Sequence, residues 1–362
     1  MKAKEFYYYD IENDLSGIDD FLFWCFIIIG GRNTGKTYSC LKSCYVIKRH
    51  FVFVKRTNED IDLLCERRKS KEDSIDYDLS PFKSINRDLG CNVRAFKLKE
   101  GIGGFYECDK DNNPIGKPLG YIVSLNSVSK VKGFDMSECE WIIFDEFIPQ
   151  PWERVDRKEG EKLMDLYKTV SRDREHRGLP PLKLICLANA TKISNPVCNI
   201  LEITDKLVDM QVGKTSIFID ESRGIFVHQI NDNTAFVEKE KQSLIYKAMA
   251  STEWGKMALS NEFAYDDFTA VKKSNLKGFM PLFAVKFKSK TYYIYNKEGI
   301  FYMTLAPAKV YRTYNLKIEN DQKAFYIDKV IDLQEASIEG RVMFEQYTMY
   351  DLIMNYKSFF KI

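Results

Sequence analysis

A glycine-rich stretch near the start of the chain has the residue types and spacing of a phosphate-binding loop. In FIIIGGRNTGKTYSC, Gly30 is followed after four residues by Gly35, Lys36 and Thr37. Glycines in such a loop let backbone N–H groups approach phosphate oxygens, the lysine reaches the β- and γ-phosphates, and the hydroxyl ligates Mg²⁺. The pattern therefore predicts a nucleoside triphosphate site. The residues expected to line it are Gly30, Gly31, Arg32, Asn33, Thr34, Gly35, Lys36 and Thr37.

Two adjacent carboxylates follow an apolar run in the middle of the chain. In EWIIFDEF, Asp145 and Glu146 come directly after Trp141–Phe144. Two neighbouring acids at the end of a buried strand are costly unless a metal ion or water occupies them. We expect Asp145 to hold Mg²⁺ through its water shell. We expect Glu146 to polarise the attacking water, a role typically worth about 10²–10⁴ in rate.

The expected nucleotide is ATP, and the expected reaction is hydrolysis. GTPases read guanine with an Asn-Lys-x-Asp element, whereas NKEG at 296–299 lacks the Asp and lies in a different predicted domain. A kinase or carrier has no need for the second acid of the Asp-Glu pair. The sequence therefore predicts an ATPase with Mg²⁺ as its metal.

The elements that must position these residues are visible as apolar runs and helical spacing. The loop follows an apolar strand and precedes a helix whose Leu41, Cys44 and Tyr45 share one face. A second helix is indicated by Leu163, Leu166, Tyr167 and Val170 at helical spacing. Strand-length apolar runs occur at Phe23–Ile29, Phe51–Val54, Tyr121–Leu125, Trp141–Phe144 and Leu184–Ala188. Such runs alternating with helices predict an α/β fold, a mainly parallel sheet with helices on both faces.

Changes in composition along the chain suggest three regions. Residues 93–125 read as antiparallel hairpins at the sheet edge, because short strands are interrupted by Gly and Asn-Pro. Residues 234–278 are helical and charged. After Pro281, two alternating aromatic runs joined by Asn296–Gly299 predict a hairpin. We expect an ATPase domain at 1–214, a lid or linker at 215–278 and a C-terminal domain at 279–362.

Composition indicates a globular chain without a membrane segment. Of the 362 residues, 45% are hydrophobic and 29% charged. The longest apolar run, Phe21–Ile29, is far shorter than the ~20 residues of a bilayer span, and the acidic opening does not resemble a leader. Nine scattered cysteines and three histidines argue against disulfides and structural zinc. These features predict a cytosolic protein.

The net charge of +2 is unevenly distributed. Residues 271–362 hold 15 Lys and Arg against nine Asp and Glu, so the C-terminal part is basic. A basic domain suggests a polyanionic partner. The alternative interpretation is an ordinary solvated surface.

Two further features have both structural and functional interpretations. Arg172, Arg174 and Arg177 cluster at the end of the predicted Leu163–Val170 helix, where charge is usually solvated. Asn189 ends the strand LICLA, where a polar side chain either senses the γ-phosphate or satisfies a turn. The residue pattern leaves these alternatives open.

Taken together, GGRNTGKT, WIIFDEF, TVSRDRE and LICLANA closely resemble, in order and spacing, the DNA-packaging (encapsidation) ATPases of phi29-like tailed phages, relatives of the large terminases. The resemblance is firm over residues 20–200 and architectural beyond them. It implies an additional-strand P-loop NTPase sheet of the RecA and terminase type. It also implies a homo-oligomeric ring, expected to be a pentamer, that uses ATP and Mg²⁺ to pump double-stranded DNA through the phage portal into a preformed capsid.

The resemblance assigns roles to further residues. Arg172 matches an arginine finger inserted into the neighbouring subunit's ATP site, with Arg174 as the reserve candidate. Such a finger is typically worth about 10³–10⁵ in rate. Asn189 matches the polar tip that couples hydrolysis to movement. Lys55 and Arg56 resemble basic residues that follow the second strand and face the nucleotide or a neighbour.

A candidate DNA-gripping loop is NSVSKVKGF, which leads from the Tyr121 strand towards the Asp-Glu strand. The resemblance places Lys130 and Lys132 against DNA phosphates, a contact independent of sequence that suits a motor. The alternative is an exposed lysine loop without a ligand.

The C-terminal domain of terminases is an RNase-H-like nuclease that needs clustered carboxylates for two metal ions. Here no carboxylate occurs between Asp267 and Glu298, where the first metal ligand would lie. We expect a vestigial, nuclease-inactive fold that contacts portal, capsid or a packaging RNA. The expected location is the host bacterial cytoplasm and transiently the portal vertex of the procapsid, not the mature virion. The alternatives are a large terminase subunit with an active endonuclease and a non-motor ATP-dependent switch.

Overall fold

The computed structural model describes residues 8–65, 79–150, 152–230, 241–252 and 268–361, together with residues 238, 255, 263 and 266. The chain divides into two units. The first comprises Met1–Ile200 and Met210–Tyr265, and the second Leu201–Asp209 and Asp266–Ile362. In the described part of the chain, no helix combines the length and apolar character needed to cross a membrane.

The first unit is built on a sheet that, over the described residues, has nine strands in the order β3-β4-β5-β2-β6-β7-β1-β9-β8. Strands β5, β2, β6, β7, β1 and β9 are parallel. At the edges the pairs β3–β4, β4–β5 and β8–β9 are antiparallel, so only β4 and β8 run against the core strands. The bounds are β1 Cys25–Ile29, β2 Phe51–Lys55, β3 Val93–Lys99, β4 Ile102–Cys108, β5 Pro114–Ser124, β6 Trp141–Asp145, β7 Lys183–Ala188, β8 Ile217–Asp220 and β9 Ile225–Gln229.

Burial explains why the central strands are continuous apolar runs. All of β1 is buried, and its alternate residues Phe26 and Ile28 join one core cluster with Leu41. Cys25 and Ile27, which face the other side, are also fully buried. Both faces of the sheet are therefore covered, as the continuous apolar pattern predicts.

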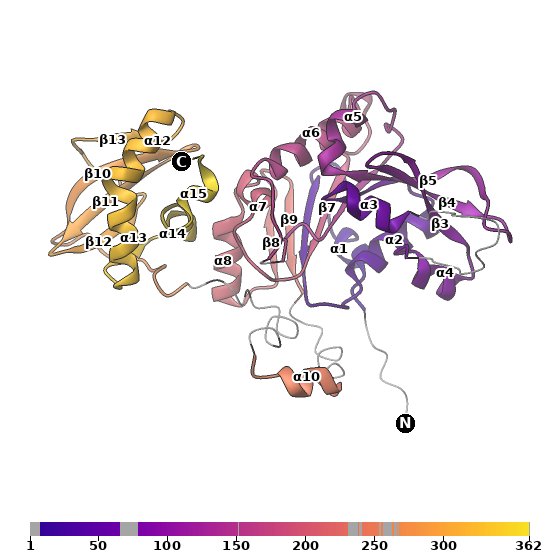
Figure 1. Cartoon of the computed structure of the whole chain (residues 1–362), viewed down its shortest axis with the longest axis horizontal. Coiled ribbons are helices and arrows are strands. Elements are labelled where there is room, and N and C mark those ends of the chain that lie inside the picture. The colour runs from indigo at the N-terminus through magenta and orange to yellow at the C-terminus, as the bar shows by residue number, and fades with distance from the viewer. Residues whose placement is uncertain are drawn as a thin grey trace. The chain divides into compact units, whose positions relative to one another are not determined.

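Helices α2, α3, α6 and α7 are among those that lie beside this sheet (Figure 1). The bounds of the described helices within residues 1–265 are α1 Ile11–Leu15, α2 Lys36–Ile47, α3 Asn58–Leu64, α4 Lys83–Leu89, α5 Val128–Val131, α6 Glu159–Ser171, α7 Pro196–Ile200, α8 Thr204–Gly213 and α10 Leu244–Met249, with 3₁₀ turns at Leu125–Ser127 and Glu175–Arg177. Helix α6 buries Leu163, Leu166 and Val170, which confirms the helical spacing seen in the sequence.

Strand β7 lies between the glycine-loop strand β1 and the acid-bearing strand β6. Ile29 pairs with Ala188 and Asp145 with Leu187, so all three strands end at the same edge of the sheet. This arrangement confirms the additional-strand P-loop fold. It also brings the residues that follow the three strands together.

The sheet extends further along the chain than the sequence suggested. Strands β8 and β9 fall within 215–278, the region expected to be a lid or linker, yet β9 pairs with β1 along its whole length. Much of 231–267 lies outside the described residues, so the expectation of a helical segment there rests on α10 alone. The predicted hairpins at the other edge are confirmed by the antiparallel pairs of β3, β4 and β5.

The second unit has a sheet that, among the described residues, contains five strands in the order β13-β10-β11-β12-β14. The bounds are β10 Met280–Phe287, β11 Lys290–Lys297, β12 Ile300–Thr304, β13 Thr313–Asn315 and β14 Val342–Phe344, with α12 Glu319–Phe325, a π-helical turn Tyr326–Val330, α13 Ile331–Ile338, α14 Tyr347–Met354 and α15 Tyr356–Phe359.

The hairpin predicted at Asn296–Gly299 is confirmed, because β11 and β12 are antiparallel across it and Gly299 has a φ of 85°. The expectation of two runs was wrong, since the first run folds into two strands. The chain turns at Lys288, which has a φ of 53°, and β10 pairs antiparallel with β11.

Candidate nucleotide-binding and catalytic site

The glycine loop joins β1 to the first turn of α2. Gly35 precedes α2 with a φ of 88°, a left-handed conformation that a residue without Cβ adopts readily. Gly35 also has no side chain to cap the helix, which leaves the first N–H groups of α2 open to an anion. At Gly30, a Cβ atom would lie 2.9 Å from Cδ1 and 3.3 Å from Cβ of Ile230, so any larger residue would displace this side chain.

Lys36 lies over its own loop. Its Nζ donates hydrogen bonds to the carbonyl oxygens of Gly30 at 3.0 Å and Gly31 at 2.8 Å, and to Oδ1 of Asn189 at 3.3 Å. Burial lowers the pKa of Lys36 to about 8, although the charges of Asp145 and Glu146 oppose this shift. The predicted strand-tip residue Asn189 is thus brought directly to the loop lysine.

The two acids meet the loop at the end of β6. Oγ1 of Thr37 donates to Oδ1 of Asp145 at 2.8 Å, and Nζ of Lys55 donates to Oδ2 of Asp145 at 2.9 Å and Oε2 of Glu146 at 3.0 Å. Burial alone would lower the pKa of Lys55, but the two carboxylates raise it above its ordinary value. Asp145 is largely buried, whereas 64% of the Glu146 side chain is exposed.

These groups line a cavity of about 430 Å³. Two of its buried polar atoms, Nε of Arg32 and Oε1 of Gln150, have no hydrogen-bond partner in the structure. An unsatisfied donor beside a phosphate-type loop fits an anionic ligand, and an unsatisfied acceptor fits a bound water. Gln150 was not identified from the sequence, because a lone Gln after the acidic pair belongs to no spacing pattern.

Lys55 and Arg56, which are adjacent at the end of β2, point to different places. Lys55 contacts both acids. Arg56 lines a separate cavity of about 270 Å³ and donates from Nε to Oε2 of Glu159 at 2.7 Å. Only 14% of its side chain is exposed.

Arg172 is not among the residues that line the glycine-loop cavity of its own chain. Its guanidinium donates to the carbonyl oxygen of Phe134 at 2.9 Å and lies 3.4 Å from Oδ1 of Asp135. Arg172 follows the last turn of α6, and the nearby Arg174 and Arg177 line a separate cavity where the parallel strands begin. Arg172 is 41% exposed and has a φ of 44°.

The reserve candidate Arg174 is buried. It donates to the carbonyl oxygens of Pro180 at 2.7 Å and Cys139 at 3.2 Å, so its contacts are structural.

Lys130 and Lys132 are both exposed, on and just after α5. Lys130 forms an ion pair with Glu100 at 2.8 Å.

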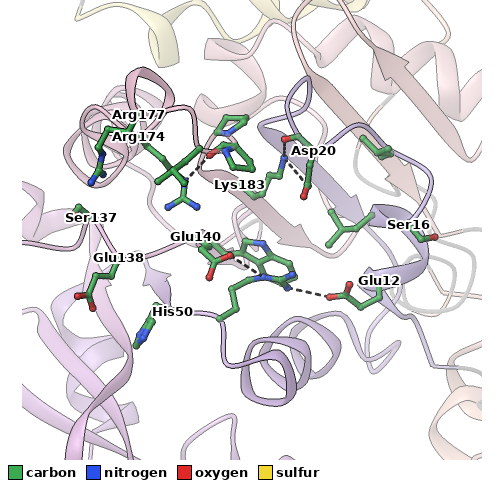
Figure 2. A pocket seen from close by; sticks show the side chains of 17 residues that line it. Glu12, Ser16, Asp20, His50, Ser137, Glu138, Glu140, Arg174, Arg177 and Lys183 are labelled. Atoms are coloured by element: carbon green, nitrogen blue, oxygen red, sulfur yellow. Dashed lines mark hydrogen bonds and ion pairs between the residues drawn. The ribbon is translucent and has the colours of Figure 1, made fainter.

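A larger cavity, about 1000 Å³, lies where the parallel strands begin (Figure 2). Figure 2 shows Arg174 and Arg177 on one side of it and Glu12 on the other. Its interior cations have partners, since Arg49 is 3.3 Å from Glu12 and Lys183 is 3.3 Å from Asp20. The candidate site is instead the cavity of about 430 Å³ around the glycine loop, because predicted phosphate-loop residues and both acids line it.

Comparison with known proteins places this site in a family. The DNA packaging protein of Bacillus phage B103 is 25% identical over 250 residues, which cover 68% of this chain and 66% of that protein. The DNA packaging protein of Bacillus phage phi29 is 26% identical over 159 residues, 44% of each chain. The matches thus span less than two thirds of these relatives' length.

Two solved structures share the fold. The Phi-28 gp11 DNA packaging motor matches with a TM-score of 0.59 and 18% identity over 99% of both chains. The bacteriophage Phi-29 viral genome packaging motor assembly matches with a TM-score of 0.62 and 18% identity, over 98% of this chain and 99% of that chain. The model of the Podovirus DNA encapsidation protein (Gp16) family matches residues 3–357, and the chain therefore belongs to this family.

Proposed function

We propose that this chain is the ATPase of a viral genome-packaging motor, which moves double-stranded DNA through a portal into a preformed capsid. The observation that carries the proposal is the hydrogen bond of 2.8 Å between Thr37 and Asp145, beside Lys36. It joins the two residue types that hold Mg²⁺ in P-loop NTPases to the lysine that binds phosphates. Family membership supports the same function.

Several residues of the cavity have a proposed role in ATP hydrolysis. Lys36 and the N–H groups of the loop would bind the phosphates, and Thr37 and Asp145 would hold Mg²⁺. When bound, this ion neutralises charge on the phosphate oxygens. Glu146 lies at the exposed rim, where it can accept a proton from a water molecule that attacks the γ-phosphate. Asn189 contacts Lys36 and is positioned to respond to the γ-phosphate.

The placement of Arg172 supports an arginine finger that acts on a neighbouring copy. Arg172 is exposed, contacts Phe134 and Asp135, and does not line the cavity of Asp145 and Glu146 in its own chain. The functional unit is then a homo-oligomeric ring, expected to be a pentamer, in which the Lys130 and Lys132 loop grips DNA. Arg174 is removed from consideration as a finger by its buried backbone contacts.

The C-terminal domain is proposed to be a nuclease-inactive, RNase-H-like binding module. Three antiparallel strands followed by β13, which pairs parallel with β10, support this fold type. Strands β10 and β11 contain no carboxylate, and the region is basic. Its proposed contacts are the portal, the capsid or a packaging RNA. The protein would act in the host cytoplasm and, transiently, at the portal vertex.

Two variants test the catalytic assignments. Glu146→Gln should bind a fluorescent ATP analogue normally and lose at least 10²-fold in turnover, because it keeps the loop and removes the base. Arg172→Ala should lose turnover and recover it when mixed with Lys36→Ala subunits, which lack a working loop but supply the arginine. Full turnover of isolated Arg172→Ala chains would contradict the finger assignment.

Oligomeric state gives an independent check. Light scattering with a non-hydrolysable ATP analogue should detect a ring. Turnover that DNA does not change, with no ring under any condition, would instead favour a non-motor ATP-dependent switch.

A further inference from the structure

The backbone of Glu146 has an unusual conformation for a glutamate. Its φ is 59°, in the left-handed region that a side chain with Cβ rarely adopts. Such a conformation persists only where surrounding contacts impose it. On one side, β6 fixes Asp145, and on the other the Phe147 N–H donates to the carbonyl oxygen of Leu187 at 3.1 Å. The carbonyl of Glu146 itself requires a third contact.

Arg56 supplies that contact. Its Nη2 donates to the carbonyl oxygen of Glu146 at 3.0 Å and to that of Phe147 at 3.2 Å. The guanidinium therefore binds the two peptide units on the carboxyl side of the left-handed residue. A guanidinium is planar and rigid. Whatever binds Arg56 at Nε therefore also fixes the direction in which Nη2 donates to these two carbonyls.

Glu159 holds the other edge of Arg56. Oε2 of Glu159 accepts from Nε at 2.7 Å, and its Oε1 accepts from Nη2 at 3.3 Å. Only 2% of Glu159 is exposed, and burial raises its pKa, with the charge of Arg56 acting in the opposite direction. A buried carboxylate bound at both oxygens by one guanidinium has little freedom to reorient, and charge-assisted bonds of this kind are strong and directional. Glu159 lies in the first turn of α6, so the position of Glu146 is tied to this helix.

We propose that Arg56 and Glu159 are positioning residues for hydrolysis, and that their buried ion pair holds the backbone of Glu146 so that its carboxylate faces the attacking water. The proposal rests on the role of Glu146 proposed above. It assigns Glu159 a function that neither its sequence surroundings nor the phosphate-loop motifs indicate. It also gives Arg56 a role inside its own chain in place of one towards a neighbour.

The test uses Glu159→Gln and Arg56→Lys in the full-length chain under ring-forming conditions. Glu159→Gln keeps the shape and removes the charge, and Arg56→Lys keeps a charge but not the planar donors. Each variant should lose about 10- to 100-fold in kcat, the size expected when a reacting group moves by about 1 Å. The KM for ATP and the affinity for a fluorescent ATP analogue should change by less than about twofold, because the phosphate loop is untouched.

Glu161→Gln is the matched control. Glu161 is exposed in the same turn of α6, and it should retain wild-type turnover. Thermal unfolding of all variants identifies any that fail to fold. If Glu159→Gln does not fold, Arg56→Lys is the informative variant. Normal kcat in both folded variants would overturn the proposal.

A double variant separates positioning from general structural support. In single-turnover hydrolysis, Glu146→Gln combined with Glu159→Gln should be no slower than Glu146→Gln alone, since the side chain being positioned is already lost. Losses that multiply would overturn the proposal, as would recovery of Arg56→Lys by mixing with Lys36→Ala subunits. If Glu146→Gln alone keeps full turnover, the proposed role of Glu146 fails first. A dead Glu146→Gln with a normal Glu159→Gln refutes only the inference.

Discussion

At the scale of single residues, Arg172, the proposed arginine finger, has a strained backbone conformation. Its φ of 44° and ψ of −119° fall in a region that favours glycine, yet the residue ends α6 with a long charged side chain. Non-glycine residues in such regions cost about 1–3 kcal/mol and cluster where function requires them. The conformation directs the side chain towards Phe134 and away from the helix.

This strain predicts an unusual ranking of two variants. Arg172→Gly should be more stable than Arg172→Ala by ~1 kcal/mol, because Ala keeps the Cβ penalty at positive φ and Gly removes it. Both should lack ring turnover. Urea unfolding followed by circular dichroism measures the difference.

Lys168, on the exposed face of α6, is a control position at which the reverse ranking of Gly and Ala is expected. At this helical position Gly should be less stable than Ala by about 1 kcal/mol. If the Gly variant is less stable than the Ala variant at both positions, the backbone at residue 172 is not strained.

At the scale of secondary-structure elements, α6 links the two functional ends of the first unit. Its first turn carries Glu159, which holds Arg56 beside the acids, and Arg172 follows its last turn. Helix α6 has 13 residues, and a helix of that length spans about 20 Å. One rigid helix therefore fixes both the chain's own acid and the arginine proposed to serve a neighbour.

The loop after β5 is the element proposed to grip DNA, and its two lysines predict a measurable salt dependence. Each phosphate contact contributes a slope of about 0.9 in log K against log salt concentration. Lys130→Gln with Lys132→Gln should therefore weaken DNA binding equally for all sequences and reduce the slope by about 1.8. Fluorescence anisotropy with duplexes of different sequence measures both.

The comparison variant replaces Lys110 and Lys117, exposed lysines in and near the β4–β5 turn. If DNA contact is confined to the α5 loop, this variant keeps the original slope. An equal reduction in both double variants would place DNA binding on a diffuse basic surface.

Much of this element structure was predictable, because the central strands are buried on both faces and appear as uninterrupted apolar runs. Strand β8 was missed since it is short and alternates, with Ile217 and Ile219 half exposed. The first strand of the C-terminal hairpin was overextended, because Lys288 and Ser289 look like ordinary exposed strand residues in the sequence.

The sequence anticipated which side chains the fold brings together where their spacing encodes geometry. Lys36, Thr37, Asp145 and Asn189 come together because the strands before them are neighbours in one parallel sheet. Glu159 was not identifiable, since it stands in the charged run RKEGEK and only its tertiary contact with β2 buries it.

At the scale of the whole molecule, the chain separates a catalytic unit from a basic one. The sequence from residue 271 onward carries a net positive charge, while strands β10 and β11 lack the carboxylates that a two-metal nuclease requires. A basic surface without metal ligands suits binding of a polyanion but not cleavage of one.

We therefore expect no nuclease activity from the full-length protein. Incubation with Mn²⁺ and supercoiled plasmid should leave the plasmid intact on an agarose gel, because no carboxylate stands on β10 or β11 to hold the first metal ion. A commercial nickase in the same buffer confirms that the plasmid and metal are competent. Nicking that EDTA abolishes would instead identify a terminase with a working endonuclease.

The position of Arg172 outside the cavity of Asp145 and Glu146 also determines how many complete sites the proposed assembly would have. If Arg172 serves a neighbour, every copy contributes to two reaction centres, and an isolated copy has no complete one. A row of copies with free ends has one fewer complete centre than it has members, and closing the row supplies the missing one. Turnover per copy is therefore expected to be negligible for an isolated chain, to rise with the length of the row, and to reach its full value when the row closes into a ring.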